Sequence, residues 1–115
     1  MKKIECYIQP YELDKVAEQL LTVEGVRGMS VTEAKGFGVQ HGFKATETPA
    51  EAKAVKLLPK LKIEMVVEEK DVDGIVEKVL AVLRTGRLGD GKVFITPVDD
   101  AIRTRTGERG SATIQ

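Results

Sequence analysis

Residues 60–67 read Lys60-Leu61-Lys62-Ile63-Glu64-Met65-Val66-Val67, with an apolar side chain at every odd-numbered position. This period of two is typical of a strand with one buried face. After Asp71 the period changes, because apolar side chains recur every three or four positions, as on one face of an amphipathic helix. These apolar residues are Val72, Ile75, Val76, Val79, Leu80 and Leu83. The sequence therefore predicts a strand followed by a helix that Asp71 caps.

The N-terminal half contains the same order of patterns. A strand-like alternation comes first, at Ile4, Cys6 and Ile8. An apolar helical face follows, formed by Leu13, Val16, Ala17, Leu20 and Leu21. Gly25 ends this predicted helix, and residues 26–35 read as a second strand. The two halves therefore repeat each other loosely.

Residues 93–96 form a last predicted strand, which Pro97 ends. The resulting order β-α-β-β-α-β predicts an α+β fold, the ferredoxin-like sandwich. Helices would cover one face of its sheet. The other face, carrying Met29, Val31 or their neighbours, would need a partner, which favours an oligomer.

Length and composition narrow the possible functions. A chain of 115 residues with 18 basic and 18 acidic side chains predicts a single domain, residues 1–115, without a general attraction for nucleic acid. The single cysteine, Cys6, falls in a strand pattern and is interpreted as a core residue in a reducing compartment. No apolar run reaches membrane-spanning length, and no signal peptide precedes the first strand, so a cytoplasmic protein is expected.

A long connection separates the two central strands, at about residues 38–58. Within it, Thr48, Pro49 and Glu51 match a capping box, which predicts a short helix that is mobile without a ligand or partner. The connection also holds the only histidine, His41, which is expected to face solvent. Because no cluster of His, Cys and carboxylate residues has the spacing of a metal site or a catalytic group, an enzyme is not expected.

Three polar segments could bind a ligand. Residues 35–42 are rich in glycine and could equally form a hinge. Residues 85–92 combine three glycines with Arg87 and Lys92, and could form either a phosphate cradle or a helix cap followed by a turn. In an extended segment Arg103 and Arg105 would point to the same side, where two guanidinium groups suit a polyphosphate, although a solvated basic tail is the alternative.

These segments carry a resemblance that extends along the whole chain. The sequence resembles the PII nitrogen-regulatory signal-transduction family. The matching segments are residues 1–5, 28–33, 35–38, 58–64, 85–92 and 103–110. The resemblance implies a homotrimer that binds ATP or ADP in clefts between subunits and regulates a transporter or enzyme through the loop at about residues 38–58. It also implies a C-terminal nucleotide-binding segment at about residues 98–115.

The resemblance further implies a set of ligand-binding residues. Those implied for the nucleotide are Ile8, Ser30, Gly36, Phe37, Gly38, Glu64, Val66, Gly89, Asp90, Gly91, Lys92, Arg103 and Arg105. It implies that 2-oxoglutarate binds through Gln40 and Lys60, with Gln40 holding Mg²⁺ beside ATP. An amide oxygen, phosphates and a keto acid are suitable hard ligands for Mg²⁺.

The chain departs from the family pattern in the loop. Residues 43–51 contain neither the tyrosine that the family modifies nor the arginine that enters ammonium channels, although Lys44 or Lys53 could supply a point charge. Val39 replaces a basic residue before the glutamine. Three hypotheses follow, and the first is a sensor of ATP/ADP and 2-oxoglutarate that acts in nitrogen metabolism. The second is an adenine-nucleotide sensor that regulates a bicarbonate or metal transporter without 2-oxoglutarate. The third and least favoured is a small nucleotide hydrolase.

Overall fold

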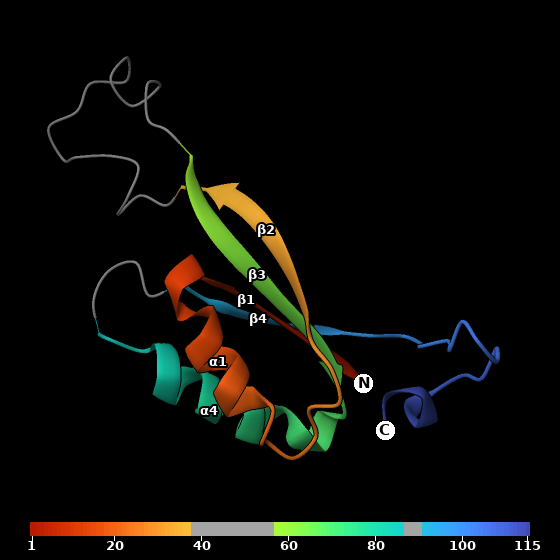
Figure 1. Cartoon of the computed structure of the whole chain (residues 1–115). Coiled ribbons are helices and arrows are strands. Elements are labelled where there is room, and N and C mark those ends of the chain that lie inside the picture. Colours follow the sequence, from red (N-terminus) through yellow and green to blue (C-terminus); the bar gives the residue numbers. More distant parts are fainter. Residues whose placement is uncertain (38–56, 87–90) are drawn as a thin grey trace, which may run out of the picture.

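The computed structural model describes residues 1–37, 57–86 and 91–115. In these segments a four-stranded sheet carries two helices on one face (Figure 1). The elements are β1 (Lys2–Ile8), α1 (Leu13–Leu20), β2 (Ser30–Gly36), β3 (Leu58–Val67), α4 (Val72–Leu83) and β4 (Val93–Pro97), with short 3₁₀ turns η1 (Pro10–Glu12), η2 (Glu69–Asp71) and η3 (Ser111–Ile114). The short helix predicted near residues 48–56 lies outside the described residues.

The sheet has the strand order β2-β3-β1-β4, and every neighbouring pair is antiparallel. This order confirms the predicted ferredoxin-like α+β fold. Strands β1 and β3 form its centre, with Ile4 opposite Met65 and Cys6 opposite Ile63. β2 and β4 are therefore edge strands.

The core lies between the two central strands and the two helices. The alternating residues of β1 and β3 point into it, as the period of two predicted. Val16 and Leu20 reach it from α1, and Ile75 and Val79 from α4, each no more than 1% exposed. Burying such side chains removes most of their apolar surface from water, which stabilises the fold by roughly 1.5–3 kcal/mol for each.

The second face of the sheet is open and more polar than the sequence indicated. Met29 and Val31 belong to the covered side, because Val31 pairs with the buried Ile63, and Met29 packs against the core. Their neighbours Ser30 and Thr32 lie on the open face instead. There Glu64 of β3 lies 3.7 Å from both Lys3 and Lys62. The face opposite the helices therefore carries the neighbours of Met29 and Val31, and the oligomer expected from it stays a prediction.

Two predicted element boundaries were also wrong. β2 begins at Ser30 rather than at residue 26, since the chain at residues 26–29 forms no ladder. α1 ends at Leu20, and Leu21 is 81% exposed beyond it. Leu21 fits the apolar periodicity of the helix, but it lies in the turn after the helix end. There its side chain does not reach the core.

Asp71 precedes α4 without capping it by its side chain. The residue has helical φ and ψ angles, and its carboxylate accepts no capping hydrogen bond. The η2 turn occupies the preceding residues and leads the chain directly into α4. The Asp71 side chain lies against Gly25, in the connection between α1 and β2, and this close contact leaves no room for a Cβ atom at position 25.

We expect Gly25→Ala to destabilise the protein by about 1–3 kcal/mol. Gly25 has a φ angle of +94°, and a Cβ atom there would lie only 2.5 Å from the Asp71 Cγ atom. Urea unfolding measures the loss. Gly28→Ala is the matched control, because no atom lies within 4 Å of a Cβ at that position. Equal stabilities for the two variants would contradict the proposed close contact.

Candidate functional site

Several of the predicted nucleotide residues lie together on the open face of the sheet. Ser30 and Glu64 are direct partners across β2 and β3, and Val66 follows two positions along the same face. Lys60 shares this face because it also occupies an even-numbered position of β3. The side chain of Ile8 points the other way and is 2% exposed in the core. Only the backbone of Ile8 is available toward the open face.

The end of the sheet near the long connection holds a second group. Gly36 pairs with Leu58, and Phe37 follows it with a side chain that is 56% exposed. Lys60 lies two residues beyond Leu58 and is half-buried. These residues are therefore close together at the end of the sheet where β2 ends and β3 begins. Gly38 and Gln40 lie outside the described residues.

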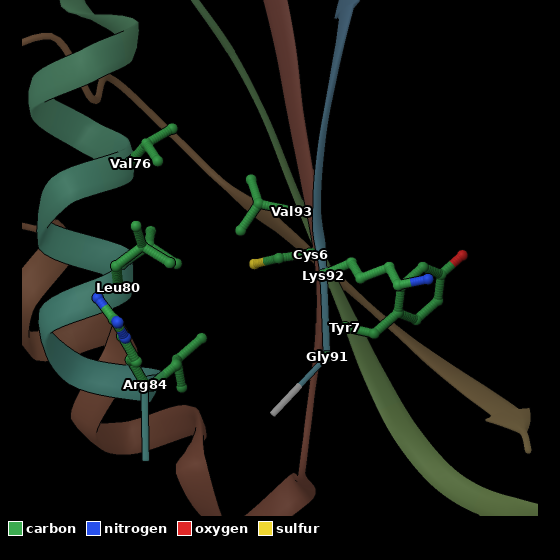
Figure 2. A pocket seen from close by; sticks show the side chains of 10 residues that line it. Cys6, Tyr7, Val76, Leu80, Arg84, Gly91, Lys92 and Val93 are labelled. Atoms are coloured by element: carbon green, nitrogen blue, oxygen red, sulfur yellow. The ribbon is translucent and has the colours of Figure 1, made fainter. Parts of the chain in front are cut away.

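The first residues of the β4 segment are fixed by a close contact with β1. Gly91 has a φ angle of +86°, and a Cβ atom there would lie 2.9 Å from the carbonyl oxygen of Tyr7. A side chain at this position is therefore excluded by both the backbone angle and the contact. Figure 2 shows the side chains of Lys92 and Tyr7 pointing away from α4, onto the open face. Gly89 and Asp90 lie outside the described residues.

A groove that the sequence did not predict lies on the other side of β4 (Figure 2). It has a volume of about 450 Å³ and separates β4 from the last turns of α4. Its walls are mostly apolar, formed by Cys6, Val76, Val79, Leu80, Leu83 and Val93. Tyr7, Arg84, Gly91 and Lys92 complete its lining, so two of the residues predicted to bind the nucleotide also border this groove.

Cys6 reaches this groove but is a core residue, as predicted. Its side chain is 1% exposed. Burial, and secondarily the negative charge of Glu5, raise the pKa of the thiol from 9.0 to about 11. The thiolate that nucleophilic chemistry requires is therefore disfavoured at neutral pH.

This pKa predicts a specific loss of stability in alkaline solution. Above pH 9 the unfolded thiol ionises while the buried thiol of Cys6 stays protonated, so the unfolded state gains relative stability. The contribution of the Cys6 thiol to the free energy of unfolding is fully present below pH 9. It falls by about 2 kcal/mol as the pH rises toward 11. Unfolding free energies measured from pH 7 to 11 should therefore drop more for the wild type than for Cys6→Val. Parallel curves for the two proteins would contradict the raised pKa.

The C-terminal segment forms a hairpin instead of the extended strand that the sequence predicted. Ile102 and Arg109 form a β-bridge, and residues 104–106 turn the chain between them. The amide of Gly107, which has a φ angle of +75°, donates to the carbonyl of Arg103 at 2.7 Å. The expectation that Arg103 and Arg105 share one side of an extended chain was therefore wrong. The turn arises because Gly107 takes a backbone angle that other residues avoid.

The three arginines of this hairpin have different surroundings. Arg109 pairs with Asp100, with 2.9 Å between Nη1 and Oδ2. Arg103 pairs with Glu108, with 3.2 Å between Nη1 and Oε1. Arg105 forms no ion pair with the described residues. Sequence reasoning assigned no role to Glu108, and its only signal was a carboxylate close in sequence to the arginine pair.

The two predicted phosphate-binding groups lie at opposite ends of the sheet within one chain. Gly91 and Lys92 precede β4, beside the C-terminal end of β1. Arg103 follows the other end of β4, where the amide of Val98 donates to the carbonyl of Met1. From Lys92 to Val98 an extended strand spans about 20 Å. Figure 1 shows the C-terminal segment continuing beyond the sheet, away from the start of β4.

No group of three or more His, Cys, Asp or Glu side chains among the described residues is arranged to hold a metal ion. Neither α1 nor α4 has the length and apolar character needed to cross a membrane, and no other helix in the described segments has them either.

The fold and the open face thus define a small ferredoxin-like α+β protein with basic and glycine-rich segments at both ends of its sheet. The family model described as "Nitrogen regulatory protein P-II" matches residues 1–108. The chain is 49% identical to the nitrogen regulatory protein P-II of Azospirillum brasilense, over 99% of this chain and 100% of that protein. It is 48% identical to that of Rhodospirillum rubrum over the same shares, and 51% identical to that of Cereibacter sphaeroides over 96% of each. The chain belongs to the nitrogen regulatory protein P-II family.

Proposed function

We propose that this protein is a PII-type signal-transduction protein that binds ATP or ADP and regulates a partner protein through the loop at about residues 38–58. The whole chain acts as one domain in this proposal. The family match carries it, because residues 1–108 include every position assigned to the nucleotide. The relatives cover the same positions at 45–51% identity.

The groups proposed to bind this ligand come from the open face and from the segments at the two ends of the sheet. In the proposal, Ser30, Glu64 and Val66 surround the adenine, with the backbone of Ile8 beside them. Gly36, Phe37 and Gly38 line the cleft next to the long connection. Gly89, Asp90, Gly91 and Lys92 hold phosphates with backbone amides and one ammonium group, and Arg103 and Arg105 add guanidinium groups that fit phosphate oxygens.

The separation of these groups supports a site that two copies of the chain share. Lys92 and Arg103 lie beyond opposite ends of β4, so one chain does not bring them together around a single triphosphate. A ring of identical subunits would place the start of β4 in one copy beside the C-terminal hairpin of the next. The homotrimer implied by the family resemblance has this head-to-tail arrangement, and it is the assembly that we propose.

The second ligand in the leading proposal is 2-oxoglutarate. Lys60 is on the open face near Gly36, where its ammonium group would pair with a carboxylate of the keto acid. Gln40, which lies outside the described residues, would hold Mg²⁺ together with the nucleotide phosphates. This metal would supply charge neutralisation between the phosphates and the keto acid.

A second candidate function rests on the loop sequence. Residues 43–51 lack both tyrosine and arginine, while the residues assigned to the nucleotide match the family. This pattern favours an adenine-nucleotide sensor with a different target, such as a bicarbonate or metal transporter, and without 2-oxoglutarate. A nucleotide hydrolase has less support, because the family that the chain belongs to is a family of signal-transduction proteins.

We expect isothermal titration calorimetry to detect binding of ATP and ADP, and Arg103→Ala to weaken ATP binding by about 1.5–3 kcal/mol. This is the scale of a charge-assisted hydrogen bond that is lost. Arg109→Ala is the matched control, since its guanidinium group is already paired with Asp100 on the same hairpin. Adding 2-oxoglutarate and Mg²⁺ separates the two candidates, because only the first predicts tighter ATP binding. Absence of any nucleotide binding by the wild type would overturn both.

A mixing experiment tests whether two copies share each site. Lys92→Ala and Arg103→Ala chains are each expected to bind ATP weakly as homomers. If they are unfolded and refolded together, a random trimer should regain wild-type affinity at about a quarter of its sites, where an intact Lys92 meets an intact Arg103. Mass spectrometry of the intact assembly verifies the trimer and the mixing. A mixture that recovers no high-affinity sites would place both residues in a site formed within one chain.

A further inference from the structure

The guanidinium group of Arg103 is held by two acceptors from different segments. Nη1 lies 3.2 Å from the Glu108 carboxylate oxygen Oε1. Nη2 donates to the carbonyl oxygen of Ala112, also at 3.2 Å. The Arg103 backbone is fixed as well, because its amide donates to the Glu108 carbonyl at 2.8 Å. Arg103 and Glu108 therefore face each other across the hairpin, and the chain just beyond it closes on the same side chain.

The acceptor from the second segment is itself held in place. Ala112 belongs to η3, the short turn that follows the hairpin. The amide of Thr113 donates to the Gly110 carbonyl at 3.0 Å, and its hydroxyl donates to the same oxygen at 2.7 Å. The Gly110 amide in turn donates to the Ala101 carbonyl at 3.0 Å, which ties the turn to the base of the hairpin. The carbonyl of Ala112 is thus a fixed point for the arginine.

The other arginines of the hairpin lack this arrangement. Arg109 contacts Asp100 through Nη1 alone, and its side chain is 69% exposed, compared with 35% for Arg103. Contacts at both terminal nitrogens define the plane of the Arg103 guanidinium group. Its Nε–H and the second hydrogens of Nη1 and Nη2 then remain available in a set direction. Such an arginine loses less rotamer freedom when an anion arrives than a solvated one does.

Glu108 could instead compete with the anion, and the geometry argues against this role. A carboxylate that replaces phosphate at an arginine usually accepts two parallel hydrogen bonds from the guanidinium group. Glu108 uses one oxygen and one nitrogen, and the neutral carbonyl of Ala112 takes the other nitrogen. The carboxylate remains 46% exposed and is anchored by the hairpin backbone. The pair therefore orients the guanidinium group and leaves donors unoccupied.

We propose that Glu108 is a positioning residue, which together with the Ala112 carbonyl holds the Arg103 guanidinium group in the orientation that receives a nucleotide phosphate. This inference rests on the proposed function and adds a residue to its site. Glu108 acts only through Arg103 and makes no contact with the ligand. A role that depends on Arg103 in this way is measurable as an energetic coupling between the two side chains.

A double-mutant cycle on ATP affinity tests the proposal, with isothermal titration calorimetry as the measurement. Glu108→Ala in the otherwise wild-type chain should weaken ATP binding by about three- to tenfold. This is the affinity lost when one long side chain, here that of Arg103, has to be ordered during binding. In the Arg103→Ala background the same change should alter affinity less than about twofold, because no guanidinium group remains to be oriented. Glu108→Gln keeps an acceptor oxygen at this position and should retain most of the affinity.

Asp100→Asn is the matched control, because it weakens the other ion pair of the same hairpin, between Asp100 and Arg109. It should leave ATP affinity unchanged. Equal losses from Glu108→Ala in both backgrounds would show that Glu108 only stabilises the hairpin, and tighter ATP binding would show that it competes with phosphate. Either result overturns the inference while leaving the proposed function intact. An Arg103→Ala variant that binds ATP as well as the wild type would instead remove Arg103 from the proposed site.

Discussion

The packing of α1 and α4 against one face of β1 and β3 is the constraint on which the rest of this structure depends. Core residues alternate with polar residues along the central strands. Because the core residues must point to the helices, the residues between them point to the opposite face of the sheet. Ile4, Cys6 and Ile8 point to the helices, and Lys3, Glu5 and Tyr7 consequently point to the open face. A shift of one residue in either strand would bury charged side chains. The register of the core therefore decides which residues can meet a ligand.

The same constraint explains why charged side chains gather on the open face. Glu64 lies between Lys3 and Lys62, so the charges of the face are partly balanced without a ligand. Exposed ion pairs of this kind contribute little to stability. They can be rearranged at small cost when a ligand or a second subunit covers the face. The oligomer that we propose rests on the separation of Lys92 and Arg103 within one chain.

The C-terminal hairpin places charged groups in unequal environments although they are close in sequence. Arg103, Arg105 and Arg109 carry the same charge, yet only Arg103 is held at both terminal nitrogens. A phosphate site benefits from donors that are ordered in advance, because less conformational freedom is lost on binding. The backbone hydrogen bonds of the hairpin provide this order. In the proposed site, the contribution of the hairpin is therefore geometric as well as electrostatic.

The sequence by itself determined the strand and helix order, the covered faces of β1 and β3, and the core position of Cys6, because hydrophobic periodicity follows burial along these strands. On α4 the same periodicity also included Leu80, which is 43% exposed. The sequence also contained the motifs of the family. Tertiary structure alone decided that Leu21 lies outside α1, that Asp71 packs against Gly25, and that Arg103 faces Glu108 across a turn. These features depend on contacts between segments and on backbone angles at single glycines. Periodicity and spacing do not encode such contacts, since each depends on where a second segment of the chain comes to lie.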